Sequence, residues 1–158
     1  MDEIKVNLQN LSGAEREELM RLIGNANKKE AWKPKYDETY YAVEGDGRVY
    51  AMMCNATKFD DRRVMINNCF ETKKEAEWMV EHLKVKAALK RYADEHNESF
   101  GSKKVYIWWN GFKEKVDAYT ENTPSITADQ IYFSSEEIAK NAIKEIGEER
   151  LKKYYFGV

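Results

Sequence analysis

The sequence predicts an α+β fold of two β-β-β-α units with antiparallel hairpins, preceded by an N-terminal helix. Two turn-forming dipeptides, Asp46-Gly47 and Asn110-Gly111, each separate two runs rich in aromatic and β-branched residues, as in β-hairpins. A helix-capping sequence follows each hairpin, beginning at Thr72 and at Ser135. The expected segments are an N-terminal helical segment at 1–30 and β-β-β-α units at 31–98 and 99–158.

Matching positions in the two predicted units are separated by nearly the same number of residues. The turn dipeptides are 64 residues apart, and Phe70 and Phe133, which end the third strand of each unit, are 63 apart. This spacing favours a duplicated unit. The alternative explanation for the match between the two helices is that any two capped amphipathic helices share the same apolar spacing.

The first helix is predicted to start at Ser12, because Ser12 and Glu15 form a capping box before an apolar stripe that ends near Gly24. The opposite face of this helix is acidic. One interpretation is that Glu15, Glu17 and Glu18 present a negative surface to the cationic groove of a partner; the other is an ordinary solvated helix face.

The first β-β-β-α unit follows a linker, in which Pro34 disfavours a helix. Its capping box at Thr72 and Glu75 begins the longest predicted helix, which extends to about Asn97. The other predicted elements are strands at 39–44 and 48–54, a charged loop at 55–63 and a third strand at 64–70.

The second unit opens with a strand in which Val105, Ile107 and Trp109 alternate with Tyr106 and Trp108. Since alternate residues of a strand face opposite sides of a sheet, either Tyr106 and Trp108 or Trp109 must look outward. A return strand at 116–120, a third strand ending in Phe133 and a helix from Ser135 complete the unit. The aromatic segment 151–158 is expected to dock on the core.

Composition and motifs exclude several classes of function. The 158 residues carry 26 basic and 28 acidic side chains, a balance that argues against a surface that is cationic throughout. No Gly-rich phosphate loop occurs, neither histidine lies beside a nucleophile in the sequence, and Cys54 and Cys69 have no partners at zinc-binding spacing. We therefore expect a non-enzyme with no catalytic residues, no metal and no cofactor.

The segment Met1–Asn10 has acidic residues and no apolar run, and no stretch of the chain has the length of apolar residues that a membrane helix needs. These features predict a cytoplasmic protein that contacts no membrane, with both cysteines reduced.

Aromatic residues interleaved with lysines are the main functional signal. Trp32 and Tyr36 in the linker, and Tyr106 and Trp108 in the second unit, are candidate partner-binding residues, because exposed rings are typical hot spots of protein interfaces. The same Trp108 is flanked by four lysines, and rings with lysines also form single-stranded nucleic-acid sites. A third interpretation is a solvated rim around core aromatics. The flanking lysines are Lys103, Lys104, Lys113 and Lys115.

Several structural motifs resemble small proteins encoded by phages and prophages of Gram-positive bacteria, over about 32–158. The motifs that carry this resemblance are Trp32-Lys33-Pro34-Lys35, Tyr40-Tyr41 before the Asp46-Gly47 turn, 68–77, 132–137 and 154–158. The resemblance implies no catalytic residues. It implies an accessory protein that inhibits host defence, of which anti-CRISPR proteins that bind an effector nuclease are the leading example.

Two functions are thus expected. The first is a phage-encoded, non-enzymatic inhibitor that binds a CRISPR effector nuclease, or its nucleic-acid complex, in the host cell and blocks its action. The alternative is a small module that binds single-stranded nucleic acid, RNA above all, through Trp108 and its flanking lysines.

Overall fold

The computed structural model describes residues 11–26, 32–99, 103–122 and 127–158, and the chain divides into two compact units, Met1–Trp32 and Lys33–Val158. The first unit contains α1 (Gly13–Ala26). The predicted capping box is confirmed, because the Glu15 carboxylate accepts the Ser12 N–H at 2.8 Å while the Glu15 N–H donates to the Ser12 hydroxyl at 3.4 Å. The expected segments 31–98 and 99–158 lie almost entirely in the second unit.

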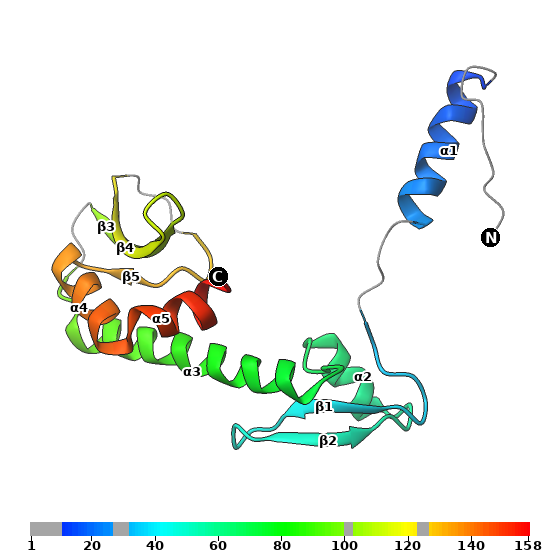
Figure 1. The fold of residues 1–158 in the computed structure, drawn as a ribbon, viewed down its shortest axis with the longest axis horizontal. Helices are drawn as coiled ribbons and strands as arrows, with labels where there is room; N and C mark the ends of the chain where they lie inside the picture. The colour runs from blue at the N-terminus through cyan, green and yellow to red at the C-terminus, as the bar shows by residue number, and fades with distance from the viewer. Residues whose placement is uncertain (1–10, 27–31, 100–102, 123–126) are drawn as a thin grey trace. The chain divides into compact units, whose positions relative to one another are not determined.

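The long helix α3 (Lys73–His96) is the spine of the second unit and carries a lobe at each end (Figure 1). Its predicted capping box at Thr72 and Glu75 is present. The first half of α3 buries Ala76 and Val80 near the first hairpin, and the second half joins the main core. We call residues 33–84 the N-lobe and residues 85–158 the C-lobe.

The N-lobe contains one hairpin and one short helix. Strands β1 (Thr39–Val43) and β2 (Val49–Met53) pair antiparallel, with Tyr41 opposite Ala51. On the other side of β1, the Tyr41 and Phe70 backbones exchange two hydrogen bonds of 2.9 Å.

The loop predicted at 55–63 and the strand predicted at 64–70 are wrong, because α2 (Lys58–Met65) occupies most of the first segment and the start of the second. Thr57 caps this helix: its hydroxyl accepts the Asp60 N–H, and the Asp60 carboxylate accepts the Thr57 N–H. These bonds satisfy amide groups that a helix start leaves without partners. The predicted third strand is therefore reduced to the bridge at Phe70.

The C-lobe is a three-stranded antiparallel sheet with helices on one face (Figure 1). Its strands are β3 (Lys104–Asn110), β4 (Lys115–Glu121) and β5 (Tyr132–Phe133), in the order β4-β3-β5. Its helices are α4 (Glu136–Ile146), α5 (Glu148–Leu151) and the π-helical turn η2 (Lys152–Phe156).

The main core lies between the C-lobe sheet, α4 and the second half of α3. Its fully buried members include Leu89, Ile107, Phe133 and Leu151. The C-terminal rings of Tyr154, Tyr155 and Phe156 pack against this cluster, so the predicted docking of the aromatic C-terminal segment is confirmed.

The α+β class is confirmed, and the two lobes also share a strand order. In each lobe the short third segment pairs with the first strand of the hairpin: Phe70 with Tyr41, and Phe133 with Val105. The N-lobe differs by the extra helix α2, so duplication of the unit stays a prediction. Within the described residues, no helix has both the length and the apolar character to cross a membrane.

Candidate binding surfaces

Four rings form a cluster on the side of the C-lobe sheet that faces away from the helices. Val105 and Ile107 point into the core, so Tyr106 and Trp108 lie on the opposite face, as one of the two predicted arrangements requires. Their ring centroids lie 5.4 Å and 5.8 Å from the Tyr119 ring, and the Tyr106 ring lies 6.2 Å from that of Tyr132. We call these four residues the aromatic face.

Trp109, the alternative outward residue, instead packs against the core. The Lys152 ammonium lies 5.6 Å from the centroid of its ring, which places a cation over an aromatic surface. Trp109 therefore contributes to the C-lobe core, whereas Tyr106 and Trp108 of the same strand lie on the aromatic face.

The charges beside the aromatic face are balanced. Lys115 donates to Asp117 at 2.8 Å, and this bond lowers the pKa of the Asp117 carboxyl. Lys104 lies opposite Glu121 in the strand register, with its ammonium 5.7 Å from the centroid of the Tyr132 ring. Two cations and two anions thus share this side of the sheet, while the predicted Lys103 and Lys113 are exposed at its ends.

Phe112 at the tip of the β3–β4 hairpin is fully exposed, and sequence reasoning missed it. The turn that carries it is fixed by the buried Asn110, whose Oδ1 accepts the N–H groups of Phe112 and Lys113, each at 3.2 Å. The signal was in the sequence, because the positions after an Asn-Gly turn usually hold polar residues and here one holds a large ring. Such a ring is a typical anchor for a partner protein.

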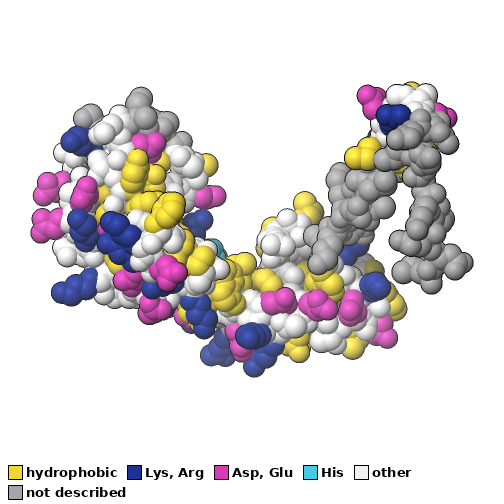
Figure 2. All heavy atoms as spheres, turned by 45° about the horizontal axis from the view of Figure 1, so that its top comes forward, with side chains coloured by type: hydrophobic (Ala, Val, Ile, Leu, Met, Phe, Trp, Pro, Cys, Tyr) yellow, Lys and Arg dark blue, Asp and Glu magenta, His cyan; other side chains and the backbone are white. Residues whose placement is uncertain are grey.

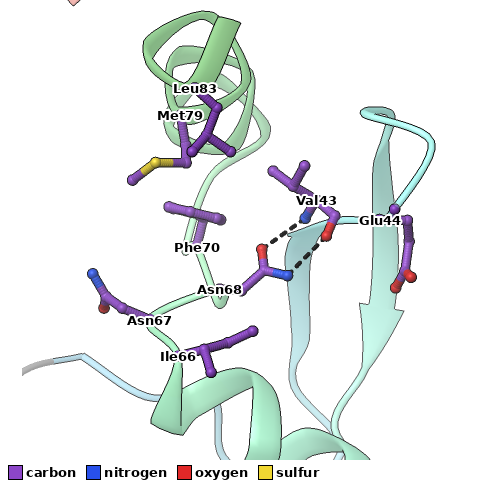
Figure 3. A pocket seen from close by; sticks show the side chains of 9 residues that line it. Val43, Glu44, Ile66, Asn67, Asn68, Phe70, Met79 and Leu83 are labelled. Atoms are coloured by element: carbon purple, nitrogen blue, oxygen red, sulfur yellow. Dashed lines mark hydrogen bonds between the residues drawn. The ribbon is translucent and has the colours of Figure 1, made fainter. Parts of the chain in front are cut away.

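A second surface, also missed, is a shallow apolar groove along α3. Its central hollow, of about 370 Å³, is lined by Phe70, Met79 and Leu83. It shares Leu83 with a hollow of about 460 Å³ and shares Phe70 and Met79 with one of about 600 Å³. Figure 3 shows Met79 and Leu83 extending from α3 toward Phe70, with Ile66 across the opening. The side-chain amide of Asn68 beside them is hydrogen-bonded within the protein, since it exchanges two 2.8 Å hydrogen bonds with the Val43 backbone.

On the face drawn in Figure 2, hydrophobic side chains reach the surface of both lobes among charged side chains of both signs. The N-lobe has several exposed hydrophobic residues, among them Phe59, Met65 and Ile66, at 67%, 83% and 72%. Exposed apolar area interspersed with mixed charge is a common feature of sites where proteins meet.

The most strongly shifted titratable groups lie in a buried network of the N-lobe. The Tyr40 hydroxyl donates to Asp60 at 2.7 Å, and Arg63 donates to both Tyr40 and Glu44. Hydrogen bonds from the Thr57 backbone and from Tyr40 lower the pKa of Asp60 to about 2. Burial and the bond to Asp60 raise the pKa of Tyr40 to about 12.

This network joins α2 to β1. Asp60 stays ionised and Tyr40 stays protonated at neutral pH. Neither group is poised to exchange a proton near neutral pH, as a general acid or base would be. Among the described residues, no three His, Cys, Asp or Glu side chains lie close enough together to hold a metal ion.

The other predicted partner-binding residues lie elsewhere. Tyr36 is 75% exposed on the N-lobe, where it lines a hollow beside α2. Trp32 and the three predicted glutamates belong to the first unit. There Glu15 is held in the cap of α1 and Glu18 pairs with Arg21 at 2.6 Å, while Glu17 is exposed.

No protein-family model matches the chain, and comparisons with curated proteins and with solved structures give no match.

Proposed function

We propose that this chain is a non-catalytic protein-binding protein that contacts its partner through the aromatic face and Phe112. The aromatic face supports the proposal most directly, because it combines four rings with balanced charges. Rings that are partly exposed and surrounded by polar groups are the usual anchors of protein interfaces. Both contact regions belong to the same C-lobe sheet, and Figure 1 shows the helices on one side of that sheet.

The resemblance to phage and prophage accessory proteins leads us to propose the class of partner. That class is a CRISPR effector nuclease of the host bacterium, which the protein binds and whose cleavage it blocks. Inhibition by binding requires no catalytic residue, in keeping with a candidate surface made of rings and paired charges. It also predicts that inhibition is stoichiometric, because each protein molecule occupies one nuclease.

The charge arrangement favours a protein partner over single-stranded nucleic acid. A nucleic-acid site needs cations that are available to phosphates beside its stacking rings. Here Lys115 is paired with Asp117, and Asp117 lies opposite Trp108 in the register. The carboxylate would thus repel a phosphate at the position where a base would stack.

One observation favours the nucleic-acid alternative. Rings on the open face of an antiparallel sheet are a known platform for base stacking, and Lys104 lies over the Tyr132 ring at the edge of this one. The two functions differ in their salt dependence, because binding to phosphates weakens steeply as salt rises.

The deciding experiment titrates the protein into DNA cleavage by candidate CRISPR effector nucleases. The variants are Phe112→Ala and Trp108→Ala, and the matched control is Phe59→Ala, which removes an exposed ring from the N-lobe. We expect cleavage to stop at one equivalent of the native protein, and half-inhibition by Phe112→Ala to need at least about tenfold more protein. The control should inhibit like the native protein.

A parallel titration uses fluorescent single-stranded RNA and DNA at low and high salt. Tight, salt-sensitive binding that Trp108→Ala removes would replace the proposal with the nucleic-acid module. Inhibition at amounts far below one equivalent would contradict a binding mechanism, because only turnover acts below stoichiometry.

A further inference from the structure

Strand β2 is the outer strand of the N-lobe sheet (Figure 1) and leaves one edge open. Its sequence, Val49-Tyr50-Ala51-Met52-Met53, carries no charged residue and no proline. Edge strands of natural proteins usually carry a charge, a proline or a bulge that blocks pairing with another chain. The lack of such protection on β2 indicates an edge that has a partner strand.

The hydrogen-bonding groups of this edge can be assigned from the hairpin register. The Tyr41 backbone points away from β2, since both of its polar groups bond to Phe70. Tyr41 and Ala51 are therefore a pair that exchanges no hydrogen bonds, and the N–H and C=O of Ala51 point outward from β2. The groups of Val49 and Met53, two residues to either side, point the same way.

These outward groups have few partners within the described residues. The Asn55 side chain donates to the Met53 carbonyl at 3.2 Å, and no other hydrogen bond to the outward groups of Val49, Ala51 or Met53 is present in the described part of the chain. By contrast, the opposite edge of the sheet is covered, since Asn68 and Phe70 bond to the backbone of β1.

The open edge is complementary to itself. In an antiparallel pair related by a two-fold axis at Ala51, that residue faces its own copy and Val49 faces Met53 of the second copy. The outward donors of one chain then meet the outward acceptors of the other. Arg48 faces Cys54 of the second copy, so no like charges oppose each other along the pair.

We propose that β2 is a dimerisation edge, at which two copies of this chain join their N-lobe hairpins into one continuous four-stranded sheet. A second copy fits the edge because uncharged residues on both chains oppose one another at every strand position. The dimer would stabilise the N-lobe sheet strongly, since a sheet of two strands is only marginally stable on its own. This dimer edge is independent of the aromatic face.

The test is sedimentation velocity of the full chain over a wide range of concentration. The native protein should shift from monomer to dimer as its concentration rises. Ala51 is exposed in the single chain, so a charge there is tolerated in the monomer but meets its own copy in the dimer. Ala51→Lys and Ala51→Glu should each weaken self-association by about tenfold or more.

Mixing these two variants provides the sharpest outcome, because Lys at position 51 of one chain then faces Glu at position 51 of the other. The mixture should dimerise where neither variant does alone. The matched control is Thr39→Lys, which places the same charge at an exposed position of the inner strand and should dimerise like the native protein.

Three results would overturn the proposal. The native protein could remain monomeric at every concentration, the position-51 variants could dimerise like the native protein, or the mixture could fail to recover dimer. Circular dichroism of each variant shows whether the monomer keeps its native fold. If a variant loses its fold, hydrogen exchange at the Ala51 amide of the native protein decides instead, because this amide should become protected as concentration rises.

Discussion

The two lobes of the second unit share one helix but are held together by different interactions. In the C-lobe, Leu89, Ile107, Phe133 and Leu151 form a continuous apolar core. In the N-lobe, fewer apolar side chains are buried, and a buried carboxylate, Asp60, joins α2 to β1 through hydrogen bonds.

This difference shows that most of the apolar burial lies in one lobe, the C-lobe, which also carries the aromatic face. Apolar burial makes the C-lobe a firm support for the aromatic face, whose rings lie directly behind core residues of the same strands. The N-lobe has less apolar burial and an open sheet edge, which are features of regions that open at low free energy. The predictions below test this contrast, from the largest expected effect to the smallest.

Removing the central ring of the C-lobe core should have the largest effect. Phe133 is fully buried between the sheet and the helices. Phe133→Ala should lower the free energy of unfolding by about 3–5 kcal/mol, because it removes apolar burial and leaves a cavity. Urea unfolding followed by circular dichroism measures the change, and a loss under about 1 kcal/mol would show that the core is not centred on this residue.

Breaking the N-lobe network should have the next largest effect. Asp60→Ala leaves the Tyr40 hydroxyl and the Thr57 amide without their acceptor. We expect a loss of about 2–3 kcal/mol, the range for a buried hydrogen bond to a charged group. The control is Asp61→Ala, which changes an exposed neighbour in the same helix. Equal losses in the two variants would contradict a special role for Asp60.

Acid should weaken the N-lobe network. The pKa of Asp60 is lowered from 3.8 to about 2, so its contribution to stability is fully present above pH 3.8 and is lost as pH falls through 2. The ¹³C shift of its carboxyl group reports the titration directly. A midpoint near the ordinary value would mean that the hydrogen bonds do not favour the ionised form.

Base should act on the same network through Tyr40. Its pKa is raised from 10.0 to about 12, so its neutral form is the one favoured in the folded protein. The contribution of Tyr40 is fully present below pH 10 and is lost as pH rises through 12. The ¹³C shift of its ring carbon bonded to oxygen measures this midpoint, and a midpoint near the ordinary value of 10.0 would contradict the assignment.

The smallest change in stability should come from Phe112. Its ring is fully exposed at the hairpin tip, so Phe112→Ala should change the free energy of unfolding by less than about 0.5 kcal/mol. Thermal unfolding of Phe112→Ala, compared with that of the native protein and of Phe133→Ala, measures this change. A large loss of stability would mean that the ring packs within the protein and is not available to a partner.

Local patterns in the sequence predicted much of the fold. The capping box at Thr72 and Glu75 located the start of α3, because side chains that satisfy helix-start amides leave a recognisable spacing. The alternation in β3 placed Tyr106 and Trp108 on the same face as each other, since a strand has a period of two.

Features that depend on tertiary contacts were not predicted. Helix α2 has no buried apolar residue that would give it a helical pattern, and its buried residue is the polar Asp60. Its cap uses Asp60 where a capping box usually has Glu or Gln, so the sequence around Thr57 departs from the usual capping pattern. The α3 groove forms only when Phe70 folds against Met79 and Leu83, which sequence periodicity does not encode.

Native-state hydrogen exchange of the free protein tests most directly whether the two lobes are held by different forces. We expect the N-lobe amides of Tyr40 and Ala42 to exchange through an opening of lower free energy than the C-lobe amides of Val105 and Ile107. Asp60→Ala should then speed exchange in the N-lobe and leave the C-lobe amides unchanged. A single opening free energy for all four amides, altered equally by the substitution, would contradict the account.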